Sequence, residues 1–305
     1  MRRALLLFAL LPCIAYADPY YWVGGSGNWA DLTHWATTSG GNIYHNTVPG
    51  SGDDIYFDAN SGSGPVSINV NVTTVYAKDF QVSAGAPAIT LNSGPVTYEL
   101  FGSLVLAANF SSSLSDAVKW NLSGTGTHNI DLGGSEISSL NLNGTGSYTL
   151  QDSLKITHNL KLNSGDFDAN SHYVRCAYLN TNLSSGDHAD FSNSTLLLTA
   201  MWSAASFSGG GTFDFSGSTL LIQGSRASLR TSISDTLSLN EIVYLQPVQH
   251  SISGNSKLKI KKMSTSGIHS FEHITRIDSL SVEGGSILNF RSGSATKIGH
   301  LSQIT

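Results

Sequence analysis

Residues 190–198 read Asp-Phe-Ser-Asn-Ser-Thr-Leu-Leu-Leu, and residues 214–222 read Asp-Phe-Ser-Gly-Ser-Thr-Leu-Leu-Ile. Only two of these paired positions differ. A second pair of matching segments lies earlier, where Leu-Ser-Gly-Thr-Gly-Thr at 122–127 recurs as Leu-Asn-Gly-Thr-Gly-Ser at 142–147. Self-similarity at a period of about 20 to 50 residues is typical of solenoids, propellers and arrays. The two pairs therefore predict a repeat protein.

The rest of the chain shows a similar repetitive pattern. From about residue 75 onward, short apolar runs are separated by Ser-Gly, Asn-Gly and Gly-Gly turns. Alternation of apolar and polar residues between such turns predicts strands, as at residues 66–72 (Val-Ser-Ile-Asn-Val-Asn-Val). The runs recur about every 20 residues, which is too short for a propeller blade of about 40. We therefore predict an all-β chain folded as a right-handed parallel β-helix of roughly eleven turns.

The composition agrees with stacked coils. Charged residues make up 12% of the chain, about half of the usual share. A chain with 12 Phe, 11 Tyr and 5 Trp is not typical of disorder, and a pI near 6.0 argues against a nucleic-acid binder. Equivalent side chains in successive coils lie about 4.8 Å apart. Ser, Thr and Asn can exchange hydrogen bonds at that distance, whereas like charges repel, so we expect few charged ladders.

The N-terminus predicts export. Arg2-Arg3, an apolar run at residues 4–14 and the exit Ala15-Tyr16-Ala17 form the pattern of a signal peptide over residues 1–17. The apolar run is too short to span a bilayer, and no second long run follows, so we expect no transmembrane helix. Cleavage would leave Cys176 as the sole cysteine, within an alternating run. We expect a buried strand thiol and no intrachain disulfide.

Two regions follow the signal peptide. Residues 18–74 form an expected N-terminal cap region that is rich in tryptophan, and residues 75–305 form the repeats. The sequence stops in what looks like the opening of another turn. We therefore expect the chain to continue into further sequence beyond residue 305 or to pair with it.

A block near the N-terminus carries a family resemblance. It comprises residues 20–29 (Tyr-Tyr-Trp-Val-Gly-Gly-Ser-Gly-Asn-Trp), His34-Trp35, and residues 48–60 (Val-Pro-Gly-Ser-Gly-Asp-Asp-Ile-Tyr-Phe-Asp-Ala-Asn). The block resembles the opening of large, repetitive, secreted surface proteins of gliding-type Gram-negative bacteria, and it is similar to autotransporter-like β-helical passengers. The resemblance implies a parallel β-helix in an adhesin-like protein that is secreted or held at the outer cell surface.

The first candidate binding site is aromatic. Flat ring faces could stack on sugars, and the candidate residues are Tyr20, Tyr21, Trp22, Trp29 and Trp35. The same rings could instead plug the open end of the first coil. We favour the plug, because exposed strand edges at a solenoid end need a cap.

The second candidate site is acidic. Asp53, Asp54 and Asp58 lie within six residues in a region without Lys or Arg, and oxygen-rich loops bind calcium. Residues 55–57 between them alternate like a strand, which points Asp53 away from the other two. We favour solvated turn carboxylates and keep calcium as the alternative.

Parallel β-helices also include glycan-cleaving enzymes, which work with clustered carboxylates. The acid pairs that qualify by spacing, and the bases that a neighbouring turn could supply, are Asp166 with Asp168, Asp187 with Asp190, Lys161 and Arg175. Both acid pairs flank Ser-Gly corners, where Asp is an ordinary turn former. We favour the turn role.

A run of lysines closes the set of candidates. The run comprises Lys257, Lys259, Lys261 and Lys262, and its alternation puts three of the four on one face of an expected strand. We favour a solvated outer face over a patch for an anionic partner. Charge is also uneven along the chain, since residues 18–77 hold five acids and no Lys or Arg, whereas nine basic residues outnumber five acidic ones from residue 226 on.

Together these observations predict a non-enzymatic, adhesin-like module that is secreted or displayed at the cell surface. It would present a stiff polar rod to glycans or surface proteins, without nucleic acid and without a cofactor. The alternative is a carbohydrate-active β-helix enzyme, either a polysaccharide lyase or a glycoside hydrolase.

Overall fold

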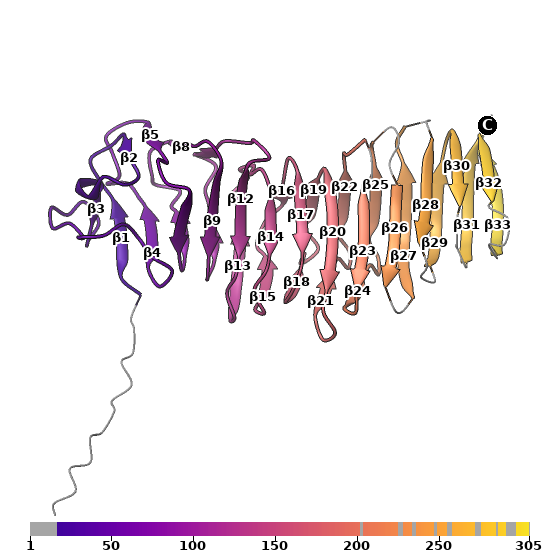
Figure 1. Ribbon diagram of the computed structural model, residues 1–305. Coiled ribbons are helices and arrows are strands. Elements are labelled where there is room, and N and C mark those ends of the chain that lie inside the picture. The colour runs from indigo at the N-terminus through magenta and orange to yellow at the C-terminus, as the bar shows by residue number, and fades with distance from the viewer. Residues whose placement is uncertain are drawn as a thin grey trace, which may run out of the picture.

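The computed structural model describes residues 17–305 except 202–203, 225–227, 234–235, 247–248, 255–257, 272–275, 285, 291–296 and 305. Residues 1–16 of the predicted signal peptide, and Lys257, lie outside the described residues. The prediction of an all-β solenoid is confirmed, because parallel coils stack into a rod of about ten turns (Figure 1).

The coils build three walls, each a sheet whose neighbouring strands come from successive coils. The eleven-stranded wall contains β6 (Thr74–Ala77), β9 (Val96–Leu100), β12 (Val118–Leu122), β14 (Leu140–Leu142), β17 (Asn159–Leu162), β20 (Tyr178–Leu183), β23 (Ala205–Gly209), β26 (Ser228–Ile233), β28 (His250–Gly254), β30 (Ile268–Phe271) and β32 (Ile287–Phe290). The ten-stranded wall contains β3 (Trp35–Ala36), β1 (Pro19–Trp22), β4 (Asp54–Phe57), β7 (Phe80–Val82), β10 (Leu104–Val105), β13 (Thr127–Asp131), β15 (Ser147–Leu150), β18 (Asp166–Asp168), β21 (His188–Asp190) and β24 (Thr212–Asp214).

The third wall begins as a four-stranded sheet of β2 (Gly27–Asn28), β5 (Val66–Asn69), β8 (Ile89–Asn92) and β11 (Phe110–Ser112). It continues as an eight-stranded sheet of β16 (Leu154–Lys155), β19 (Tyr173–Cys176), β22 (Thr195–Leu198), β25 (Thr219–Ile222), β27 (Leu237–Tyr244), β29 (Leu258–Thr265), β31 (Arg276–Glu283) and β33 (Lys297–Ile304). After β24 the ten-stranded wall ends, and the strands of the third wall lengthen to 8 residues in β27, β29, β31 and β33. The coil thereby changes from three strands to two.

The sequence repeats stack directly on one another. Leu122 pairs with Leu142, and Asp190 pairs with Asp214, so the matching segments are neighbours in space. Within the two matching segments, Asn193 stands where the later one has Gly217. The backbone explains this difference, because both residues have positive φ, at 55° and 67°. Asn and Gly are the residues that most readily accept this left-handed conformation.

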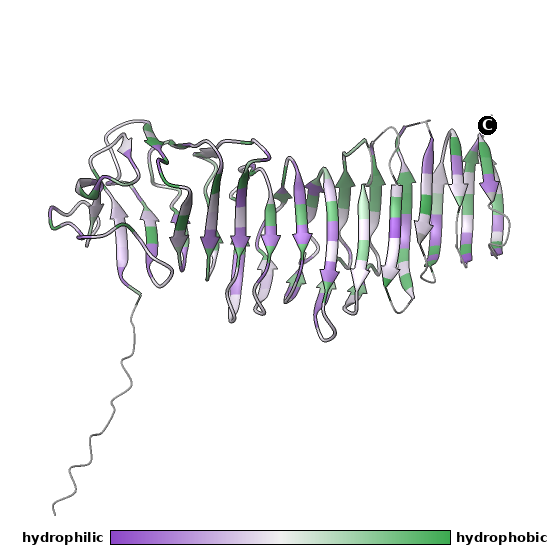
Figure 2. Ribbon diagram, in the orientation of Figure 1, coloured by the Kyte–Doolittle hydropathy of each residue, from purple (hydrophilic) through white to green (hydrophobic). Residues whose placement is uncertain are grey.

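The interior is filled by the inward half of each alternating strand. Figure 2 shows hydrophobic and hydrophilic residues interleaved along the strands, and the buried set forms one continuous core. Aromatic rings stack from coil to coil, as between Tyr98 and Trp120 with centroids 4.0 Å apart and between Phe191 and Phe215 at 5.1 Å. Each coil thus covers the apolar side chains of the next, which is the main source of its stability.

The N-terminal end is closed by a short antiparallel strand. β3 pairs antiparallel with the outer edge of β1, just after the 3₁₀ turn η1 (Leu32–His34). Meanwhile β1 and β2 already pair in parallel with β4 and β5. The predicted cap region 18–74 therefore contains the first coil as well as the segment that covers it.

Glycine at the corner between β14 and β15 is dictated by close backbone approach. A Cβ on Gly144 would lie 2.2 Å from the carbonyl oxygen of Gly124 in the coil before it. We predict that Gly144→Ala lowers the free energy of unfolding by about 1–3 kcal/mol, since this backbone must shift. Urea unfolding would measure the loss. Gly94→Ala is the matched control, because nothing lies within 4 Å of its added Cβ. Equal midpoints for the two variants would contradict the explanation.

Candidate functional site

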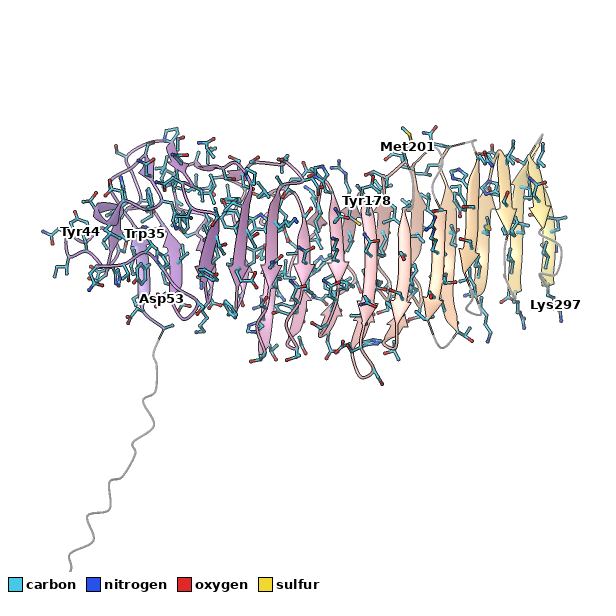
Figure 3. All side chains as sticks on the ribbon, in the orientation of Figure 1. Trp35, Tyr44, Asp53, Tyr178, Met201 and Lys297 are labelled. Atoms are coloured by element: carbon cyan, nitrogen blue, oxygen red, sulfur yellow. The ribbon has the colours of Figure 1, made fainter. Side chains whose placement is uncertain are left out.

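The predicted aromatic site is mostly interior. Trp22 and Trp35 have no exposed surface, and Trp29 and Tyr20 are 1% and 4% exposed. Trp35 contacts Trp22 edge-on at 5.0 Å and Trp29 at 4.9 Å, and Figure 3 labels it at the N-terminal end of the rod. Four of the five rings therefore have no free face for a sugar, and their packing is that of a hydrophobic plug.

Tyr21 is the half-buried member of the set. Its ring stacks on Tyr56 of the next coil with centroids 4.9 Å apart, because the two residues pair in register between β1 and β4. Sequence reasoning missed Tyr56, although its alternation with Ile55 and Phe57 places it on the outer face. Tyr21, from the predicted stacking site, and its neighbour Tyr56 are therefore the rings that remain partly exposed at the surface.

The predicted calcium ligands are each used locally. Asp53 accepts a hydrogen bond from the backbone N–H of Gly50 at 2.8 Å, and Asp58 accepts one from that of Asn60 at 2.9 Å. Asp54 lies 3.8 Å from the Lys78 ammonium, and burial and the nearby Asp79 raise its pKa. Among the residues described, no three His, Cys, Asp or Glu side chains are grouped to hold a metal ion. The backbone bonds of Asp53 and Asp58 fit the favoured role of turn carboxylates.

The acid pairs proposed for catalysis meet on the ten-stranded wall. Asp166, Asp168 and Asp190 line a shallow depression of about 220 Å³ together with His188. Asp168 pairs with Asp190 in register. Asp187 stays at the corner, where its carboxylate accepts the backbone N–H of Ser184 at 2.8 Å.

The turn role accounts for these carboxylates. Asp168 accepts the backbone N–H of Asn170 at 2.6 Å, and Asp190 accepts that of Ser192 at 2.7 Å. Asp166 accepts the backbone N–H of His188 at 2.9 Å. Such side-chain-to-backbone bonds are the ordinary work of Asp at a corner.

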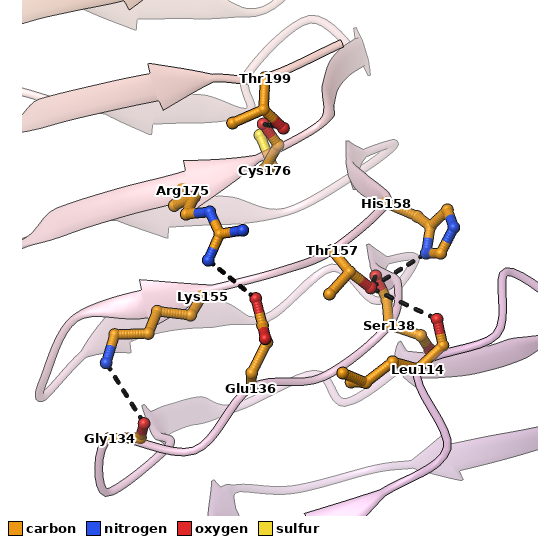
Figure 4. A network of polar contacts seen from close by, with 10 residues as sticks. All are labelled: Leu114, Gly134, Glu136, Ser138, Lys155, Thr157, His158, Arg175, Cys176 and Thr199. Carbon is orange, nitrogen blue, oxygen red and sulfur yellow. Dashed lines mark hydrogen bonds and ion pairs between the residues drawn. The ribbon is translucent and has the colours of Figure 1, made fainter. Parts of the chain in front are cut away.

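The two bases proposed to assist these acids lie on other walls. Lys161 belongs to β17 of the eleven-stranded wall and Arg175 to β19 of the third wall. Arg175 bonds Glu136 at 3.0 Å, and Lys155 bonds the Gly134 carbonyl at 3.3 Å (Figure 4). His188, which the sequence analysis did not single out, is the base that lies beside the carboxylates.

Neutral ladders follow the walls as expected. On the eleven-stranded wall, Asn141 donates to Asn121 at 2.7 Å. Asn163 donates to Asn143 at 2.8 Å just beyond the ends of β14 and β17. Each bond joins a side chain to the equivalent one in the neighbouring coil, which fixes both carboxamides in one orientation.

Two charged columns occur as well, although stacking disfavours them. Asp168, Asp190 and Asp214 pair in register on the ten-stranded wall. Lys259, Arg276 and Lys297 do so on the third wall. In the acidic column, each carboxylate accepts a backbone N–H two residues further on, with Ser216 serving Asp214. These bonds offset the repulsion between stacked like charges.

Cys176 lies in the core between coils. Its side chain is fully buried, and burial raises the pKa of its thiol to about 12. The thiolate is the reactive form of cysteine, so the Cys176 thiol is unreactive in the folded protein. The expectation of a buried strand thiol is confirmed.

Two histidines lie inside the C-terminal coils. His250 and His269 are each 1% exposed, and their rings stack with centroids 4.9 Å apart. Tyr244 packs against both. Burial, with the neighbouring His250, lowers the pKa of His269 to about 4, although its ring bonds the Ser266 carbonyl at 2.9 Å.

We predict that stability depends on His269 at mildly acid pH. The unfolded chain binds a proton near pH 6.5, whereas the folded chain binds it only near pH 4, so stability falls as the pH drops through this window and by about 3 kcal/mol in total. Urea midpoints measured from pH 7.5 to pH 4 would test this. His269→Phe should flatten the pH dependence, and an unchanged slope in that variant would refute the assignment.

A thiol-labelling experiment tests the burial of Cys176. In a Cys13→Ser variant of the full chain, where Cys176 is the sole thiol, a maleimide should leave the native protein unlabelled and label it fully in guanidinium chloride. Labelling of the native state at the rate of a free thiol would show that the core opens there.

Within the part of the chain that the structure describes, there is no apolar helix of the length that a membrane span requires. Comparisons with family models, curated proteins and solved structures found no match for this chain.

Proposed function

We propose that this protein is an exported, non-enzymatic adhesin-like module that presents its rod-shaped surface to glycans or other proteins. The signal-peptide pattern at residues 1–17 and the resemblance of residues 20–60 favour export. The solenoid supports a presenting role, since stacked repeats create extended binding surfaces.

The observation that carries the proposal is the row of carboxamides along the eleven-stranded wall, in which Glu99 and Lys161 are charged members. The carboxamides of Asn121, Asn141, Asn159 and Asn180 bond in pairs at 2.7 and 3.3 Å. Asn141 is buried, with 8% of its surface exposed, so the half-buried Asn121, Asn159 and Asn180 supply the donors and acceptors that remain for a ligand. Because the rotamers of these side chains are already fixed, binding costs little conformational entropy. Such a surface suits hydroxyl-rich ligands such as sugars.

Glycan cleavage is the second candidate, and one observation favours it. The depression on the ten-stranded wall collects Asp166, Asp168, Asp190 and His188. Lyases and hydrolases use such groups as acid and base. We rank it second because each of these three carboxylates already holds a backbone N–H of a corner or strand.

A glycan array, with a panel of cell-surface proteins beside it, tests the first proposal on the full chain. We expect binding, and we expect Asn143→Ala with Asn163→Ala to weaken it about tenfold by removing two exposed carboxamides of one ladder. Thr90→Ala with Ser111→Ala is the matched control, because these hydroxyls form an equivalent exposed pair on the third wall, 3.0 Å apart. Absence of binding to every glycan and protein would overturn the proposal.

An assay of polysaccharide breakdown separates the two candidates. Incubation of the full chain with acidic and neutral polysaccharides should release neither reducing ends nor unsaturated products. Release that disappears in Asp190→Asn and persists in Asp58→Asn, a turn carboxylate just beyond β4, would establish the enzyme instead.

A further inference from the structure

The outer face of the last coils carries cations stacked in register. Lys259 on β29 pairs with Arg276 on β31, and Arg276 pairs with Lys297 on β33. All three side chains are exposed, and Figure 3 labels Lys297 at the C-terminal end of the rod. The sequence pattern indicated only the lysines that follow one another along a single strand. The fold adds Arg276 and Lys297 from two further coils.

This basic column works against the stability of the free protein. Paired strands lie about 4.8 Å apart, and like charges directly opposite one another are destabilising. In the acidic column, hydrogen bonds from backbone N–H groups offset the repulsion between the carboxylates. The basic column cannot form such bonds, because a cationic side chain cannot accept a hydrogen bond from a backbone N–H. This repulsion raises the question of which interaction offsets it.

Nearby carboxylates neutralise the surface only in part. Asp278 pairs with Arg276, and Glu241 pairs with Lys262 at 2.5 Å. Even so, β29, β31 and β33 together carry five Lys or Arg residues and two Asp or Glu residues. A net positive strip thus lies on a chain whose overall charge is -5.

The surroundings of the column indicate the kind of anion that fits. A row of serines, Ser264, Ser281 and Ser302, runs in register along the same strands, and the last two hydroxyls lie 3.0 Å apart. The three strands contain no Phe, Tyr or Trp, whereas proteins that hold single-stranded nucleic acid stack its bases on aromatic rings. Regularly spaced cations, with a row of hydroxyls five residues further along the same strands, match a linear sugar polymer that bears carboxylate or sulfate groups.

We infer that the outer face of β29, β31 and β33 is a binding surface for a linear anionic glycan, held by Lys259, Arg276 and Lys297. This inference rests on the proposed function and deepens it, since it names the class of ligand and the part of the rod that binds it. The anionic groups would lie along the column and relieve its repulsion, so the ligand would stabilise the coils that bind it.

Binding of the full chain to dextran sulfate and to polygalacturonate, measured over a range of salt concentrations with neutral dextran as the uncharged probe, tests the inference. We expect binding to both polyanions that weakens as salt rises. The triple variant Lys259→Gln, Arg276→Gln, Lys297→Gln should bind at least tenfold more weakly. Its slope of log K against log salt should be shallower by about 2, as expected for the loss of three cations on a flexible polyanion.

The matched control removes the same charge elsewhere on the chain. Lys78→Gln, Lys155→Gln and Arg175→Gln alter a residue just beyond β6 and residues of β16 and β19, away from the carboxamides of the eleven-stranded wall, and this control variant should bind within twofold of the unaltered chain. A second readout needs no ligand. At low salt the first triple variant should melt at a higher temperature than the unaltered chain, because its stacked repulsion is gone, and a lower melting temperature would mark the column as structural.

The outcomes separate the two proposals. Equal losses in both triple variants would overturn the inference in favour of attraction by net charge alone. Binding to neutral glycans or proteins without binding to either polyanion would overturn it and leave the proposed function standing. Tighter binding of single-stranded DNA than of dextran sulfate at equal salt would assign the surface to nucleic acid. Binding to nothing would overturn both.

Discussion

The hydrogen-bonded register between successive coils is the constraint on which the rest of this structure depends. Parallel pairing at about 4.8 Å places each residue beside its counterpart in the next coil, as Leu122 lies beside Leu142 and Leu196 beside Leu220. A side chain that points inward must therefore pack against the equivalent side chain of the next coil. A side chain that points outward must be compatible with its equivalent at the same distance. This requirement explains why apolar residues recur inside and why Ser, Thr and Asn dominate outside.

The same register decides the electrostatics of the surface. Neutral amides gain hydrogen bonds from stacking, as between Asn121 and Asn141. Stacked carboxylates repel, but Asp168, Asp190 and Asp214 each bind a backbone N–H and turn the chain at the same corner. Of the stacked cations Lys259, Arg276 and Lys297, Arg276 pairs with Asp278, but a cation cannot accept a backbone N–H and so cannot hold a corner in this way. That contrast is why the basic column, and not the acidic one, suggests a ligand.

The ends of the core show a different use of ring chemistry. At the N-terminal end, Trp35 of the antiparallel strand β3 packs edge to face on Trp22 and Trp29, so aromatic bulk replaces the coil that would otherwise cover β1. Toward the C-terminal end, His250 and His269 take up interior positions. Burying an ionisable ring favours its neutral form, which ties the stability of these coils to pH.

The sequence by itself determined the fold class. Its repeats of about 20 residues, its alternating strands and its Gly/Asn corners are local properties that survive without knowledge of any contact. It also indicated the burial of Cys176 and the plug role of the tryptophans, since alternation and the need to close a solenoid end are readable from the chain. Which residues meet across coils was decided only by the tertiary structure. Strand register sets that, and here neighbouring equivalents are separated by 17 residues between Lys259 and Arg276 but by 24 between Asp190 and Asp214. Unequal corners of this kind hid the charged columns and the separation of Arg175 from Asp168, because a coil can lengthen at any corner without changing the pattern of its strands.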